Sequence, residues 1–234
     1  MEEFMRLIRL YFIKNRKGTK GMKRIFIAAS VFLLISMLGA HALAAYAPVG
    51  VGEKERYNIN LFLSNFSEQG MMFYSSGRVN DETLVNFALD HIWLNRQDLV
   101  ERADFGAHNF RIADDRIEGI ALKYFGVAPE SYASSRYAYH DGFFYGESTG
   151  GYMGNGVVSL SHVEDMGGGV YGVYFGCYGE GEFFAADDCY LRPEQAAVRF
   201  AGSAVHTGYA MIDTHAAGLL SREGWTLMQY DVLN

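Results

Sequence analysis

The sequence predicts an α+β fold in which N-terminal helices pack on a C-terminal antiparallel sheet. Apolar residues recur at helical spacing in two segments between residues 80 and 125. After Ser131 the apolar runs shorten, and glycine and aromatic residues become frequent. Two-residue turn signals then separate consecutive strand-like segments. Helices followed by strands with tight turns are typical of α+β proteins with antiparallel sheets.

Three segments make up the expected helical part. Tyr57–Glu68 is rich in apolar residues, but its period fits a short helix and a strand equally, so both remain open. Asn80–Arg102 carries one apolar stripe at helical spacing and begins with residues that favour a helix N-terminus. Asp114–Phe125 has a second stripe, and Gly126 suits a left-handed helix end. Gly119 should weaken this helix or allow close packing on a neighbour.

The rest of the chain contains the expected strands. Arg136–His140 and Phe143–Gly146 flank Asp141-Gly142, a dipeptide that favours a two-residue hairpin turn. A longer hairpin is expected around a turn near residues 165–169. Its two strands and the two that follow are expected at Val157–Glu164, Val170–Tyr178, Tyr209–Asp213 and Trp225–Leu233.

The segment Val170–Tyr178 has two different faces. Because side chains alternate along a strand, the positions that start at Tyr171 form a wholly apolar face, which should be core. The other face mixes glycine with tyrosine at Gly172, Tyr174 and Gly176. Glycine on a strand favours the close approach of another group, so a helix or an aromatic ring is expected to lie against this face.

The N-terminal region has the pattern of an export signal. Residues 25–38 form an uncharged apolar run after a cluster of basic residues, and Ala42-Leu43-Ala44 suits cleavage before Ala45. An uncleaved anchor is the alternative, because residues 25–44 are long enough to span a bilayer. The expected organisation is a basic cytoplasmic extension or mis-assigned start (1–21), a signal peptide or anchor (22–44), a tether (45–56) and a single α+β domain (57–234). We expect an extracellular or cell-surface protein, membrane-anchored if residues 25–44 are retained.

The charge of the expected mature part restricts its partners. Of the 20 basic and 27 acidic residues, eight basic and two acidic ones precede Ala45. The remaining 12 basic and 25 acidic residues give a formal net charge of −13. This charge argues against nucleic acid and against an anionic membrane surface as partners, so contact with a membrane is expected only through residues 25–44.

Several segments resemble a loose group of uncharacterised exported proteins of Gram-positive bacteria. They are INLFLSNFSEQG (59–70), FRIADDRIEGIALKYFGV (110–127), GGGVYGVYF (167–175) and WTLMQYDVL (225–233). The resemblance implies export and one domain with this order of elements. It transfers no catalytic residues, and no cofactor is expected.

The two cysteines, Cys177 and Cys189, leave two alternatives open. In an oxidising compartment they are candidates for a disulfide. A regular hairpin around residues 179–182 would hold them too far apart, because a disulfide needs Cα atoms within roughly 7 Å. The other reading is two buried thiols.

Two polar clusters suggest chemistry without a specific motif. His206, Asp213 and His215 lie within ten residues and are of the types that bind zinc. Glu180, Glu182, Asp187 and Asp188 offer carboxylates for calcium or for glycoside hydrolysis, although neither a calcium-loop register nor a nucleophile motif accompanies them. A solvated acidic loop is the simpler interpretation.

Aromatic residues between 137 and 184 are too many for one buried face, so some tyrosines should be exposed. The candidates for ligand contact are Tyr145, Tyr152, Tyr174 and Tyr178. We therefore expect an exported non-catalytic module that binds cell-wall glycan, a peptide or a surface protein. The alternatives are a secreted hydrolase of wall polymers that uses the acidic residues, and a membrane-anchored accessory subunit.

Overall fold

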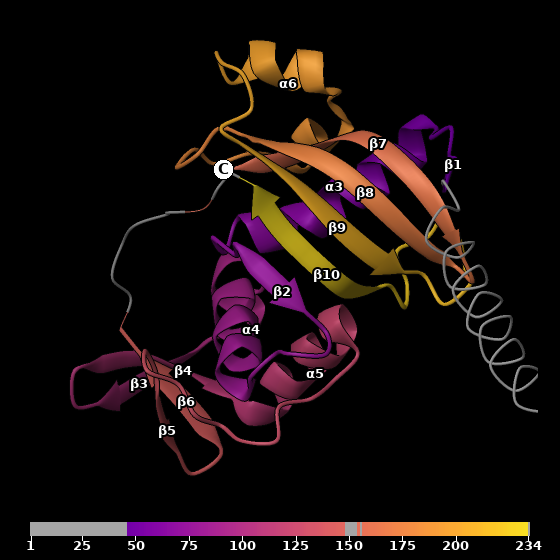
Figure 1. The fold of residues 1–234 in the computed structure, drawn as a ribbon. Coiled ribbons are helices and arrows are strands. Elements are labelled where there is room, and N and C mark those ends of the chain that lie inside the picture. Colours follow the sequence, from indigo (N-terminus) through magenta and orange to yellow (C-terminus); the bar gives the residue numbers. More distant parts are fainter. Residues whose placement is uncertain (1–45, 148–153, 155, 234) are drawn as a thin grey trace, which may run out of the picture. The chain divides into compact units, whose positions relative to one another are not determined.

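The computed structural model describes residues 46–147, 154 and 156–233. Residues 46–234 form one compact unit, which is described here by itself. Its fold is α+β, with two antiparallel sheets (Figure 1). The expected signal or anchor, residues 22–44, lies outside the described residues. Within the described part, no helix has both the length and the apolarity needed to cross a membrane.

The large sheet has six strands in the order β1-β7-β8-β9-β10-β2. The strands β7 to β10 form its centre and come from the C-terminal part of the chain, whereas the two edge strands are short (Figure 1). The strand bounds are β1 Ala47–Pro48, β2 Phe73–Ser75, β7 Val157–Gly167, β8 Val170–Tyr178, β9 His206–Asp213 and β10 Thr226–Leu233.

The small sheet has the order β3-β4-β6-β5 and comes from the middle of the chain. Its strands are β3 Glu101–Phe105, β4 His108–Ala113, β5 Ala138–His140 and β6 Phe143–Gly146. The predicted hairpin at Asp141-Gly142 is confirmed, because β5 pairs with β6 and both turn residues have positive φ, 50° and 79°. That geometry matches the two-residue turns that suit strand twist.

The helices are α3 Glu53–Ser67, α4 Asp81–Asn95, α5 Asp114–Phe125 and α6 Pro193–Arg199, with short 3-10 turns at η1 Gln97–Leu99 and η2 Ala186–Tyr190. The ambiguous segment 57–68 is helical. The predicted helix 114–125 is confirmed, and Gly126 ends it in the left-handed region (φ 71°). Strands β2 to β4 lie between helices, so the expected order of helices before strands holds only in part.

Several predicted boundaries are wrong, two of them in the N-terminal half. The helix expected to run to Arg102 ends at Asn95, because Arg96 leaves helical geometry (φ −138°, ψ 53°) and β3 begins at Glu101. The tether expected at 45–56 is partly ordered structure: Ala47 and Pro48 pair with β7, and α3 starts at Glu53. A carboxylate from Glu55 accepts the Gly52 N–H at 2.6 Å and caps the start of α3.

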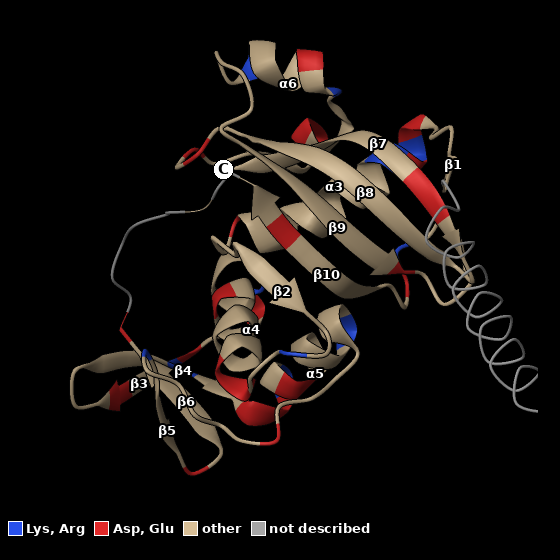
Figure 2. Cartoon of the chain, in the orientation of Figure 1, with Lys and Arg blue, Asp and Glu red and all other residues tan. Residues whose placement is uncertain are grey.

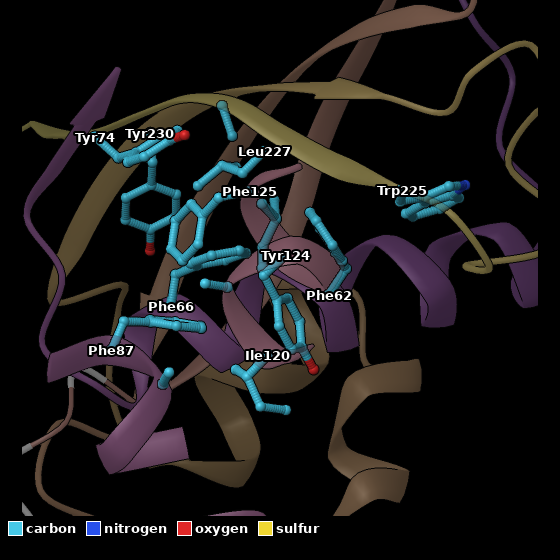
Figure 3. Close-up of a cluster of buried hydrophobic side chains, with 14 of the residues drawn as sticks. Phe62, Phe66, Tyr74, Phe87, Ile120, Tyr124, Phe125, Trp225, Leu227 and Tyr230 are labelled. Atoms are coloured by element: carbon cyan, nitrogen blue, oxygen red, sulfur yellow. The ribbon is translucent and has the colours of Figure 1, made fainter. Parts of the chain in front are cut away.

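One core joins the helices to the inner face of the large sheet. Buried side chains of α3, α4 and α5 interlock with those of β8, β9 and β10. Aromatic rings dominate its centre, where Phe66 stacks on Phe87, meets Tyr124 edge to face and packs against a tilted Tyr230 (Figure 3). The predicted apolar face of β8 is confirmed, because Val173, Phe175 and Cys177 all belong to this core.

Polar side chains of α3 bond to the backbone of β7 along its outer edge. The Leu160 N–H donates to Asn60 Oδ1 at 2.8 Å, and the Val158 N–H donates to Ser64 Oγ at 2.9 Å. Arg56 returns a hydrogen bond to the Leu160 carbonyl at 3.2 Å. These bonds explain why α3 buries Asn60 and Ser64: each satisfies a strand group that no neighbouring strand pairs there.

A second, smaller core covers one end of the outer face of the large sheet. It contains Val157 of β7 and Tyr178 of β8, together with Cys189 and side chains of α6. Tyr178 is only 7% exposed there. The rest of the outer face, toward Gly172, holds the exposed residues described next.

Candidate functional site

The outer face of the large sheet carries a row of four polar or aromatic residues, one from each central strand. Backbone pairing places His162 opposite Tyr174, Tyr174 opposite Tyr209, and Tyr209 opposite Asp231. Cross-strand partners share one face of a sheet, so these side chains lie next to one another. We call His162, Tyr174, Tyr209 and Asp231, with Glu164 beside them, the outer tyrosine surface.

The two tyrosine rings form its centre. Their centroids are 4.9 Å apart and the rings are tilted by 55°. The ring of His162 flanks Tyr174 at 5.7 Å on the other side. Tyr174 is 40% exposed, so the pair presents an open aromatic edge to solvent.

Gly172 lets the Tyr209 ring lie flat on the sheet. A Cβ at Gly172 would stand 2.9 Å from the Tyr209 hydroxyl and 3.3 Å from its ring. The Tyr209 hydroxyl is further placed by a 3.6 Å contact to Met166 Sδ. The prediction that a ring approaches the glycine-containing face of β8 is therefore confirmed, and the approaching ring is that of Tyr209.

Acidic groups border the tyrosine pair. Burial raises the pKa of Tyr209, and the nearby Tyr174, Glu164, Tyr46 and Asp231 raise it further, in that order. The carboxylates come from both sides: Glu164 pairs with Gly172 from β7, and Asp231 pairs with Tyr209 from β10. Figure 2 shows these acidic segments on β7 and β10, on either side of the two central strands. The surface therefore has negative potential over aromatic rings.

His162 holds one of these carboxylates. Its Nε2 lies 3.5 Å from Glu164 Oε1, which is an ion pair when the imidazole is protonated.

The structure does not bring the four predicted tyrosines together. Tyr174 lies on the outer tyrosine surface, whereas Tyr178 is buried beneath α6. Tyr145 belongs to the small sheet, where its ring packs 4.5 Å from Phe105 and is almost wholly buried. Tyr152 lies outside the described residues. The alternation of side chains along the strand placed Tyr178 on the correct face of the sheet. It gave no information on α6, which covers that end of the face.

The expected zinc ligands are also separated. His206 begins β9 and Asp213 ends it, seven residues further along an extended strand. His215 Nδ1 lies 3.5 Å from Asp213 Oδ2, so these two form a pair. No group of three or more candidate ligands occurs among the described residues.

The acidic loop near η2 is used structurally at one position. Asp188 accepts the Ala185 N–H at 2.8 Å, which caps η2, and lies 3.3 Å from Arg199 Nε of α6. These contacts engage one of the four acidic residues considered for calcium binding or hydrolysis.

Cys177 and Cys189 are free, buried thiols in the structure. Burial raises the pKa of Cys177 to about 11 and that of Cys189 to about 12, so both remain protonated at neutral pH. Cys177 also contacts the Ser67 hydroxyl at 3.5 Å. Of the two alternatives that the sequence left open, the structure has the buried thiols.

Comparison with known proteins identifies no relative. No family model, curated protein or solved structure matches the chain. The functional argument therefore rests on the geometry of the site.

Proposed function

We propose that the protein is an exported, non-catalytic module that binds an ammonium-bearing component of the cell envelope through the outer tyrosine surface. The observation that carries the proposal is the exposed Tyr174–Tyr209 pair, bordered by the carboxylates of Glu164 and Asp231. Export is inferred from the apolar run at 25–38 and the basic residues before it.

The chemistry of this surface favours a cation. The faces of aromatic rings are electron-rich and attract ammonium groups within about 6 Å of the ring centroid. Two flanking carboxylates add a charge attraction, and the strongly acidic mature part enriches cations near the surface. Among cell-wall glycans, envelope peptides and surface proteins, the ligands that fit are those with free amino groups.

The proposal is tested by co-sedimentation of the full chain with purified cell walls of its host. Walls in which the free amines have been acetylated serve as the ligand control, because acetylation removes the positive charge. We expect the chain to sediment with native walls and about tenfold less with acetylated walls. Equal binding to both preparations would contradict recognition of an ammonium group.

A matched pair of tyrosine variants locates the site. Tyr174→Ala should weaken binding severalfold, since a cation–π contact contributes on the order of 1 kcal/mol. Tyr190→Ala is the control: Tyr190 is 42% exposed and also stacks on a second tyrosine, Tyr57, at 4.3 Å. That second pair has the Arg222 guanidinium 5.9 Å from the centroid of the Tyr57 ring. If both variants bind as the unchanged chain does, the outer tyrosine surface is not the site.

The position of the chain in the cell is tested separately. Intact mass of the protein from the medium and from the membrane fraction distinguishes the two expectations for residues 22–44. A mass that begins at Ala45 in the medium supports a secreted module, and a full-length mass in the membrane supports the anchored accessory subunit.

A further inference from the structure

A second candidate site, independent of the outer tyrosine surface, lies where the C-terminal ends of α3 and α4 meet the loop before η2. It is a cavity of about 240 Å³. The described residues that line it are Leu61, Ser64, Asn65, Glu68, Leu94, Asn95, Phe183, Phe184 and Ala186. Among these, Glu68 is the single ionisable residue.

The Glu68 carboxyl is nearly buried, with a side chain only 10% exposed. Asn95 Nδ2 donates a hydrogen bond to its Oε1. Burial raises the pKa of Glu68 to about 7, although hydrogen bonds from Asn95 and Gln69 act in the opposite direction. A carboxyl with this pKa is protonated in a large fraction of molecules near neutral pH and then donates a hydrogen bond.

Uncharged polar side chains next to Glu68 form a network of contacts. His91 Nδ1 lies 3.9 Å from Glu68 Oε1, and His91 Nε2 lies 3.4 Å from the Tyr124 hydroxyl. That hydroxyl donates to Asn65 Oδ1 at 3.3 Å. Burial lowers the pKa of His91 to about 3, so the imidazole is uncharged and does not hold Glu68 in its ionised form.

Other charged or titratable groups face this network from every packed element. They are Arg96 just after α4, Lys123 on α5, Cys189 on η2, and Arg222 in the loop before β10. The charges of Lys123 and Arg96 lower the pKa of His91. Neither these two side chains nor Arg222 line the cavity.

The chemistry of the side chains that line the cavity indicates which class of ligand fits it. The described lining residues include no basic side chain that would hold an anion. Ser64 accepts the Val158 N–H and Asn65 accepts the Tyr124 hydroxyl, which leaves recognition to Glu68 and Asn95. Phe183, which is 76% exposed, and Phe184 provide aromatic surface on which the C–H face of a sugar packs. The volume is below that of sites for drug-sized ligands and suits a single ring.

We propose that this cavity binds one neutral sugar unit of a glycan, with the Glu68 carboxyl donating a hydrogen bond to an acceptor on the sugar. Asn95 positions the carboxyl, and Phe183 packs on the sugar ring. The proposal concerns a different ligand and a different place from the outer tyrosine surface, so either one stands if the other fails.

The test uses the N-acetylglucosamine tetramer as the probe and isothermal titration of the full chain at pH 5.5 and pH 8.5. We expect the dissociation constant to rise at least tenfold between the two values, as Glu68 loses the proton that it donates. Affinity that instead increases with pH would mean that an ionised Glu68 accepts a hydrogen bond from the sugar, and it would overturn the proposal. Absence of binding at pH 5.5 would overturn it as well.

Variants complete the test. Glu68→Gln keeps a donor of similar shape and should bind the tetramer with the same affinity at both pH values. Phe183→Ala alters an exposed side chain, leaves the buried network intact, and should weaken binding severalfold at pH 5.5. Val198→Ala, at an 83% exposed position of α6, should leave tetramer binding unchanged. Wild-type affinity of the Phe183→Ala variant would remove the cavity as the site even if Glu68 variants fail to fold.

Discussion

Glu68 Oε1 and His91 Nδ1 lie 3.9 Å apart, yet their surroundings disfavour a charge on either group. Burial is the largest cause of both pKa shifts, upward for the acid and downward for the base. Near neutral pH the pair is therefore better described as two polar groups in a shared desolvated site than as a salt bridge.

The first prediction concerns Glu68 and alkaline stability. Its folded pKa, about 7, lies above the ordinary value of 4.5, so its contribution to stability is full below pH 4.5 and is lost as pH rises to about 7. Glu68→Gln removes this loss and should raise the free energy of unfolding at pH 8 by about 3 kcal/mol. Urea unfolding at pH 4 and pH 8 checks it. If the free energies of unfolding of the variant and the wild type differ by the same amount at both pH values, the raised pKa of Glu68 is contradicted.

The second prediction concerns His91 and acid stability. Its folded pKa, about 3, lies below the ordinary 6.5, so the unfolded chain takes up a proton that the folded chain excludes. Stability is full above pH 6.5 and falls as pH decreases toward 3. His91→Gln should lose less stability than the unchanged chain between pH 7 and pH 4, by about 3 kcal/mol. The readout is the free energy of unfolding at both values, and parallel pH profiles would argue against a buried neutral imidazole.

The third prediction compares the hydroxyls of a buried tyrosine and a half-buried tyrosine. Tyr74 is buried in the aromatic core (Figure 3), and its hydroxyl has no hydrogen-bond partner among the described residues. Tyr74→Phe should be neutral or stabilising, because the folded state no longer desolvates an unpaired hydroxyl. Tyr137→Phe is the matched control, since the Tyr137 hydroxyl donates to Asp90 at 2.9 Å, and it should destabilise by about 1 kcal/mol. Thermal unfolding of both variants measures the two changes in stability. If Tyr74→Phe destabilises more than Tyr137→Phe, the Tyr74 hydroxyl has a hydrogen-bond partner.

The fourth prediction uses two glycines in different surroundings. At Gly208 a Cβ would stand 2.4 Å from Phe175 and 2.8 Å from the Asp231 carbonyl, so Gly208→Ala should destabilise by about 1–3 kcal/mol. At Gly119 nothing lies within 4 Å of the added carbon, which means that this glycine does not serve close packing. Gly119→Ala should therefore stabilise α5 by about 0.5–1 kcal/mol. Chemical denaturation of the two variants, with opposite signs expected, is the measurement.

The sequence was most informative where local chemistry decides structure. Asp114–Phe125 was predicted closely, because its apolar stripe and Gly126 act within one helix. The turn at Asp141-Gly142 was equally local. By contrast, β3 contains the mostly polar segment Glu101–Phe105 and has no clear period, so its place in the small sheet depends on pairing with β4.

In the two candidate sites, too, the sequence predicts local features but not the contacts that the fold creates. Tyr174 was a candidate from strand alternation alone, but Tyr209 becomes its neighbour only through the register of β8 with β9. Glu68 and His91 lie on different helices, and no spacing in the sequence indicates that they meet. Their altered pKa values arise from burial that the packing of α3, α4 and α5 creates, so the sequence pattern did not reveal the cavity.

The hydrogen bonds from α3 to β7 restrict the ways in which this protein engages a partner. Many peptide-binding domains extend a sheet by accepting an additional strand along an open edge. Between Val158 and Leu160 that edge is already satisfied by Asn60 and Ser64, so a strand-shaped ligand would have to displace a buried helix. Because α3 side chains cover this edge, two copies are also hindered from pairing edge to edge. Along this stretch of β7, binding of a partner is therefore directed to side chains and away from backbone pairing.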